Sequence, residues 1–115
     1  MIINLDKVYK INIDFFDIYI IDDKRRKFSK KELINTSTRV FEGVQYNNLY
    51  IIESKVTYLI PLPNNYQNKC VFLQNLIGET GIILHPLEKY ILLYNTNENL
   101  VYLNKNIPIC KIKEV

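Results

Sequence analysis

The side chain with the widest chemical repertoire in this sequence is its single histidine, His85. Any mechanism in which an imidazole activates a serine or cysteine nucleophile would have to use it. Nothing near it in the sequence supplies a partner, and no second histidine or paired cysteine motif has the spacing of a metal site. Because Pro86 follows directly, we expect His85 to be a structural residue at the end of a strand, and we expect no metal or cofactor.

Carboxylates are present but scattered. Asp14 and Asp17 are separated by an odd number of positions, so a regular strand would direct them to opposite faces and not into one acid–base pair. The turn at 78–81 has two glycines but lacks the Lys-Ser/Thr pair and the helix that a phosphate-binding loop requires. The sequence therefore favours a protein without catalytic activity.

The most concentrated polar feature is a basic cluster, in which six of the eight residues from 24 to 31 are cationic. Such a cluster could bind nucleic-acid phosphates in a salt-dependent manner. The competing interpretation, which we favour, is a solvated loop partly neutralised by Asp22 and Asp23, because only Phe28 offers an aromatic ring that could stack on a base. The six candidate residues are Lys24, Arg25, Arg26, Lys27, Lys30 and Lys31.

Apolar and polar residues alternate through most of the chain, which is the period of half-buried strands. One short helix is expected near 30–35, where Ser29 and Glu32 have the spacing of a capping box. The expected strands, joined by turns and corners, are 8–15, 16–21, 39–46, 49–53, 55–60, 69–76, 81–84, 89–94, 100–103 and 107–115.

The turns between these strands have recognisable residues. Asn47 and Asn48 predict a tight hairpin turn, since asparagine tolerates positive φ angles better than other non-glycine residues. The polar residues 95–98 predict a second hairpin between 89–94 and 100–103. Prolines predict a corner at 61–65 and another at His85 and Pro86.

Length and composition define the class. A chain of 115 residues forms one domain, here 1–115, and 48% hydrophobic with 23% charged residues is typical of a folded globular protein. The core residues are Ile, Leu, Val, Tyr and Phe with no alanine, a choice that AT-rich coding also produces. We expect an all-β fold, a small sandwich or distorted barrel of about eight to ten short strands.

No apolar run is long enough to span a membrane, and residues 1–10 lack the order of a secretion signal, so we expect a cytoplasmic or virion location. In a reducing compartment, Cys70 and Cys110 are expected to be buried free thiols.

The order of motifs in the second half resembles the all-β fold of dUTPases and dCTP deaminases. Residues 57–66 resemble a strand ending in a proline-bearing turn, 78–84 a glycine-bounded turn, and 104–112 the closing strand of that family. The resemblance covers roughly half the chain. It implies a homotrimer.

The catalytic motifs of that family are missing from this chain. Residues 73–76 replace its Arg-Ser-Ser motif, and 87–90 shorten the segment that carries its hallmark aspartate. The nearest remnants are Glu88 and Tyr90, but their spacing differs by one position from that of the family, so the resemblance transfers no role to either. A degenerate nucleotide pocket near these two residues is a separate hypothesis.

Three functions follow from these observations. The leading hypothesis is a non-enzymatic β-domain that binds a protein partner or itself, as a structural or interaction module of phage, viral or other AT-rich origin. The alternatives are a protein that binds or sequesters nucleotides at Glu88 and Tyr90, and an accessory nucleic-acid-binding protein that uses the loop 24–31.

Overall fold

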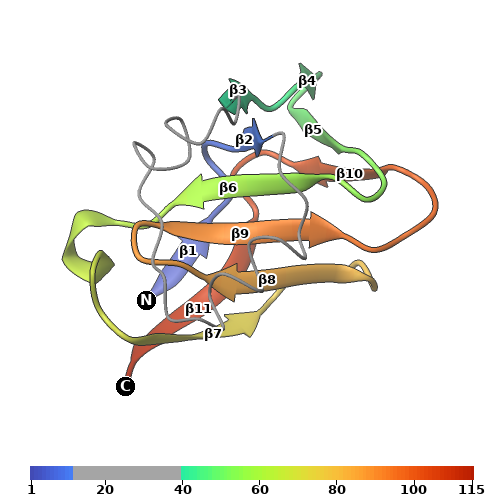
Figure 1. Ribbon diagram of the computed structural model, residues 1–115. Helices are drawn as coiled ribbons and strands as arrows, with labels where there is room; N and C mark the ends of the chain where they lie inside the picture. Colours follow the sequence, from blue (N-terminus) through green and yellow to red (C-terminus); the bar gives the residue numbers. More distant parts are fainter. Residues whose placement is uncertain (12–39) are drawn as a thin grey trace.

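Strands account for most of the residues that the structure describes, which are 1–11 and 40–115 of a computed structural model (Figure 1). The only helical element in these ranges is a 3₁₀ turn, η1 (Asn64–Tyr66). The strands are β1 (Ile2–Asn4), β2 (Tyr9–Ile11), β3 (Val40–Glu42), β4 (Gln45–Tyr46), β5 (Leu49–Ile52), β6 (Thr57–Pro61), β7 (Val71–Asn75), β8 (Ile82–Pro86), β9 (Tyr90–Asn95), β10 (Val101–Asn104) and β11 (Pro108–Glu114).

The all-β prediction is confirmed. The eleven described strands form three antiparallel sheets with the orders β3-β2-β6-β9-β8, β10-β5-β4 and β1-β11-β7, and none of the three closes on itself. β1 is not predicted by the sequence, because three residues are too few to show a period. The predicted strand 16–21 and helix 30–35 lie outside the described residues.

The five-stranded sheet is built around β6 and β9, in which nearly every side chain is buried. Tyr58 and Leu93 contribute to one hydrophobic cluster, while Leu59 and Leu92 contribute to another on the opposite face. Both faces are therefore withdrawn from water, which explains why these strands read as continuous apolar runs and not as an alternation.

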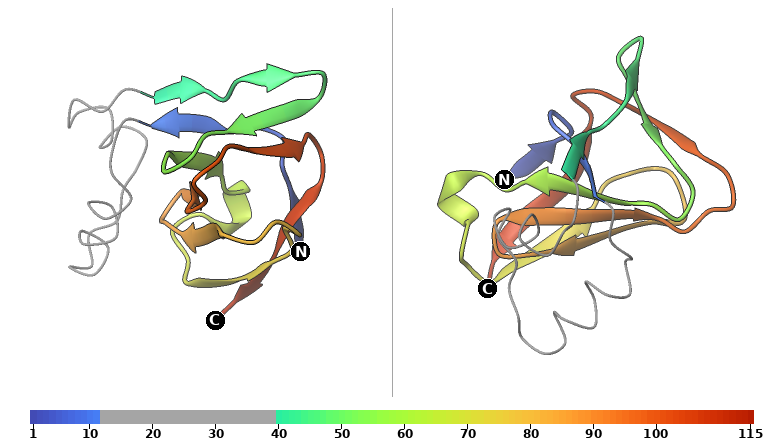
Figure 2. Two further views of the ribbon diagram at one scale, coloured as in Figure 1. Left: turned by 90° about the vertical axis from the view of Figure 1, so that its right-hand side faces the viewer. Right: turned by 45° about the horizontal axis from the view of Figure 1, so that its top comes forward.

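The larger cluster is shared by all three sheets. The β10-β5-β4 sheet contributes Ile52 and Leu103, and the β1-β11-β7 sheet contributes Ile3 and Ile112. Burial of these aliphatic side chains against the five-stranded sheet is the main driving force that holds the three sheets together. Figure 2 shows how the strands of the three sheets lie relative to one another, and the side chains of the larger cluster come from all three.

One predicted hairpin is wrong. β9 is flanked by β6 and β8, and β10 pairs with β5 instead, with Tyr102 opposite Ile51. The physical reason is that β6 and β8 already occupy both edges of β9, so β9 has no free edge for β10. The side-chain amide of Asn95, which is fully buried, secures the alternative path. Its Nδ2 donates to the carbonyl oxygens of Ile52 (3.0 Å) and Asn99 (3.1 Å), and its Oδ1 accepts from the backbone N–H of Asn97 (2.9 Å). These bonds hold the turn after β9 against the end of β5.

The predicted strand 39–46 is divided between two sheets at Gly43, since β3 pairs with β2 and β4 pairs with β5. The Gly43 N–H donates to the carbonyl oxygen of Val8 (2.7 Å), and a Cβ at this position would lie 2.2 Å from Val8 Cγ1. The chain can change sheets here only because glycine has no side chain.

Two predicted turns have different outcomes. The tight turn at Asn47 and Asn48 is confirmed, with φ angles of 48° and 64° at its two central residues. The corner expected at His85 and Pro86 is wrong, because both residues belong to β8 and pair with β9.

Replacing Asn95 with alanine should lower the free energy of unfolding by about 3 kcal/mol, because it leaves buried backbone groups without their hydrogen-bond partners. Urea denaturation followed by circular dichroism measures the loss. Asn104→Ala, on the exposed side of β10, is the control and should change stability by less than about 0.5 kcal/mol. Equal effects of the two substitutions would contradict the role of Asn95.

Burial raises the pKa of Tyr58 to about 12, and its hydroxyl accepts a hydrogen bond from the Glu53 N–H (2.9 Å). The raised pKa means that the folded state favours the neutral phenol. The contribution of the neutral Tyr58 phenol to the free energy of unfolding is therefore complete below pH 10 and is lost as the pH rises toward 12. The total loss is about 3 kcal/mol. The urea concentration at half-unfolding, measured from neutral to alkaline pH, should fall less steeply for Tyr58→Phe than for the wild type. If it falls equally for both proteins, Tyr58 is not the source of the alkaline loss of stability.

Candidate functional site

The β10-β5-β4 sheet buries one face and leaves the other open. Tyr50, Ile52 and Leu103 point inward and are nearly inaccessible to solvent. Because side chains alternate along a strand, the residues between them point outward. Asn104 also points outward, at one corner of the sheet. The apolar and tyrosine members of the outward set, which we call the tyrosine face, are Val44, Tyr46, Leu49, Ile51, Leu100 and Tyr102.

The register places these side chains in two rows across the sheet. Tyr102 lies opposite Ile51, whose N–H donates to the carbonyl oxygen of Val44 (3.0 Å), and Tyr46 lies opposite Leu49 in the second row. Tyr46 is 65% exposed, Val44 61% and Tyr102 52%. Large apolar side chains from three strands therefore face solvent together.

The segments that build the tyrosine face contain no charged residue. Residues 44–52 and 100–104 lack Asp, Glu, Lys and Arg, although these make up 23% of the whole chain. The nearest charges lie at the margin, where Lys10 forms an ion pair with Glu53 and where Lys105 follows β10. The face is thus an uncharged surface with a charged border.

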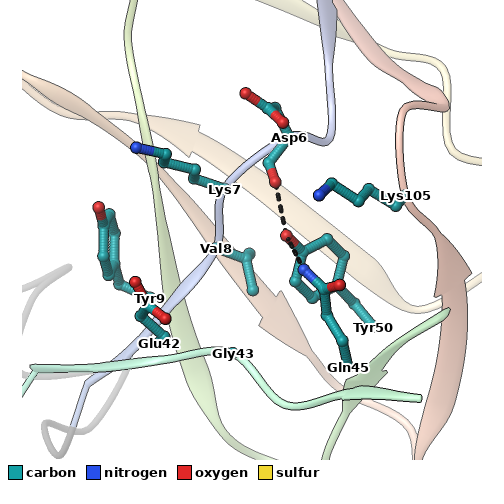
Figure 3. A pocket seen from close by; sticks show the side chains of 9 residues that line it. All are labelled: Asp6, Lys7, Val8, Tyr9, Glu42, Gly43, Gln45, Tyr50 and Lys105. Atoms are coloured by element: carbon teal, nitrogen blue, oxygen red, sulfur yellow. Dashed lines mark hydrogen bonds between the residues drawn. The ribbon is translucent and has the colours of Figure 1, made fainter. Parts of the chain in front are cut away.

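The β4–β5 hairpin stands out from the body of the protein (Figure 2) but is held by specific hydrogen bonds. The Tyr50 hydroxyl donates to the carbonyl oxygen of Asp6 (2.5 Å) and accepts from Gln45 Nε2 (2.7 Å), as Figure 3 shows. At the hairpin turn, the Lys105 N–H donates to the Asn48 carbonyl oxygen (2.7 Å). These contacts fix the hairpin, and the tyrosine face with it, to the rest of the fold.

The hydrogen-bonded tyrosine lies in a polar pocket of about 190 Å³ (Figure 3). Burial raises the pKa of Tyr50, and the nearby carboxylates of Asp6 and Glu42 raise it further. The phenol therefore stays protonated at neutral pH and keeps donating to Asp6. The pocket is lined by Asp6, Lys7, Val8, Tyr9, Glu42, Gly43, Gln45, Tyr50 and Lys105.

A more apolar recess of about 510 Å³ borders the tyrosine face. Val44 belongs to both surfaces, and the exposed ring of Phe41 on β3 lies beside it in the recess. The described residues that line the recess are Lys10, Ile11, Phe41, Glu42 and Val44.

A third pocket, of about 230 Å³, brings together His85 and Cys70, which lie far apart in the sequence. Glu88 also lines it, and Lys69 at its edge pairs with Glu114 (2.9 Å). Sequence spacing could not reveal this pocket, because it forms where the start of β7 meets the end of β8. Within the described ranges, no group of three or more His, Cys, Asp or Glu side chains is placed to hold a metal ion.

Glu88 and Tyr90, the two residues of the expected nucleotide pocket, lie in different surroundings. Glu88 lines the third pocket, whereas the ring of Tyr90 is 7% exposed and packs in the smaller hydrophobic cluster with Leu59 and Leu92. The basic cluster from Lys24 to Lys31 lies outside the described residues.

The two cysteines differ in environment. Both are free thiols, but the expectation that both are buried is wrong for Cys70, which is exposed just before β7. Cys110 is 0% exposed, because it shares the inward face of β11 with Ile112, and the register shift between Ile3 and Asn4 turns Ile109 inward beside it. Burial raises the pKa of the Cys110 thiol to about 11.

Comparison with protein-family models, with curated proteins and with solved structures gave no match. Among the described residues, no helix has the length and apolar character needed to cross a membrane.

The native protein should expose one reactive thiol to a charged aromatic disulfide reagent. Cys70 is accessible, whereas Cys110 is both buried and held in its protonated form, and only the thiolate attacks the reagent. Absorbance should report one fast equivalent in buffer and two in denaturant. Cys70→Ser should abolish the fast equivalent, and a fast reaction that survives this substitution would contradict the burial of Cys110.

Proposed function

We propose that this protein is a non-enzymatic, protein-binding β-domain and that the tyrosine face is its binding surface. The observation that carries the proposal is the exposure of Val44, Tyr46 and Tyr102 on an uncharged sheet face, in a chain with 23% charged residues. Charge depletion together with tyrosine enrichment is the composition that distinguishes the core of a protein interface from ordinary surface.

Folding alone does not account for this exposure. The inner face of the same sheet already supplies the buried core residues Tyr50, Ile52 and Leu103, so the exposed parts of the outer tyrosines do not contribute to the core of the monomer. A tyrosine side chain presents about 150–250 Å² of surface, so Tyr46 and Tyr102 together leave roughly 200 Å² in contact with water. A partner that covers these rings would gain the hydrophobic stabilisation that the fold does not use.

The surface is also prepared for binding before any partner arrives. The two-residue turn at Asn47 and Asn48 and the hydrogen bonds of Tyr50 hold the hairpin in one conformation. Tyrosine loses little conformational entropy when it is covered, and a fixed backbone avoids the cost of ordering a loop.

Other functions have less support among the described residues. Glu88 lines the third pocket, whereas the ring of Tyr90 packs in the smaller hydrophobic cluster, so the geometry gives nucleotide binding at this pair less support than the exposed tyrosines give protein binding. An interaction or structural module of a phage, virus or AT-rich microbe is the biological setting that agrees with the proposal.

The proposal is tested with immobilised protein and an extract of the source cells. Mass spectrometry should identify a protein that the wild type retains and that the double variant Tyr46→Ser/Tyr102→Ser does not. Removal of two interface tyrosines should weaken binding to that purified partner at least ~30-fold per ring, measured by calorimetry.

Phe72→Ser is the matched control. Phe72 is 64% exposed on the outer side of β7, in a different sheet. The Phe72→Ser substitution therefore removes a similar exposed ring and leaves the tyrosine face unchanged. A partner retained equally by the wild type and both variants would show that the binding surface lies elsewhere.

A further inference from the structure

We infer that the tyrosine face binds the same face of a second copy of this chain and forms a weak, two-fold symmetric dimer. The inference rests on the proposed function and names the partner. Three observations support it: the tyrosine face has no charged residues, its side chains are arranged so that large groups can meet small ones, and its area is small.

The absence of charge makes this surface compatible with itself. A two-fold interface brings the same patch of both copies together, so a charge near its centre would lie close to an identical charge. Residues 44–52 and 100–104 contain none, whereas the chain as a whole carries +3 and would repel its copy through other surfaces. The central strand β5 is therefore free to approach its counterpart.

The side chains are arranged so that large groups can meet small ones. β5 lies in the middle with Leu49 and Ile51, and each flanking strand carries one exposed tyrosine. If the symmetry axis runs along the strands, Tyr102 faces Val44 of the second copy and Tyr46 faces its Asn104. If the symmetry axis runs across the strands, Tyr46 faces Val44 of the second copy and Tyr102 faces its Asn104. Both arrangements match each ring with a smaller side chain, as close packing of two sheets requires.

The size of the face predicts a weak complex. The four-residue strands β5 and β10 and the two-residue strand β4, about 4.8 Å apart and rising about 3.3 Å per residue, present a face well below the roughly 800 Å² per partner of a standard interface. The inner core is complete in each copy, so the monomer does not need its partner in order to fold. We therefore expect a reversible dimer with a dissociation constant on the order of 100 µM.

The test is sedimentation equilibrium of the full chain from about 5 to about 500 µM. The apparent mass should rise from 13.7 kDa toward twice that value. Ile51→Lys and Ile51→Glu place a charge at the centre of the face and should each raise the dissociation constant at least ~10-fold. An equimolar mixture of these two variants should restore association, because opposite charges then meet. Phe72→Lys, on the other sheet, should associate like the wild type.

Each remaining outcome overturns the inference. A wild type that stays at 13.7 kDa throughout, a mass that converges on a trimer, or association that survives Ile51→Lys would exclude this dimer. Failure of the mixed variants to associate would exclude the two-fold contact at β5. These failures are distinguishable from failure of the proposed function, since a monomer can still bind a different protein through Tyr46 and Tyr102. Circular dichroism of every variant verifies that it is folded.

Discussion

A single buried side-chain amide joins two sheets in the second half of this chain. Asn95 ends β9 inside the core and binds the carbonyl oxygen at the end of β5, across 43 positions of the sequence. A buried amide without partners would cost several kcal/mol, so the chain around it must supply them. Backbone groups of β5 and of the turn after β9 do so. Because β6 and β8 occupy both edges of β9, the chain leaves the five-stranded sheet here, and the bonds of Asn95 hold the turn at the end of β5, where β10 begins to pair.

The surrounding turns reinforce the same junction. The Thr96 N–H and hydroxyl both donate to the carbonyl oxygen of Gly81, and the Ser54 hydroxyl donates to that of Asn97. The ends of β5, β8 and β9 are thereby bound to one loop. The consequence is a third sheet that rests on the core with one face and presents the other to solvent. The tyrosine face exists because β10 completes that sheet.

Parts of the fold and of the candidate site can be foreseen from local pattern, and other parts cannot. The alternation of residues identifies most strands, and Asn47-Asn48 identifies a hairpin turn, because these features depend on near neighbours. The predicted hairpin of β9 with β10 fails, since nothing local distinguishes a solvated asparagine from a buried one. Gly43 looks unremarkable in sequence, and its role depends on Val8, 35 positions away. The pocket lined by Cys70 and His85 likewise could not be predicted from the sequence, because its residues lie at or beside two different strands.

Local residue pattern is sufficient to predict short strands with an aliphatic and aromatic core, because side-chain period and turn residues act over a few positions. The printed sequence also shows that the tyrosines and asparagines of 44–52 and 100–104 lie in uncharged segments. That these two segments lie side by side, and that Tyr46 and Tyr102 share one exposed face, depends on the tertiary structure. Strand pairing across some fifty residues depends on which groups must be buried together, and that is a property of the whole fold.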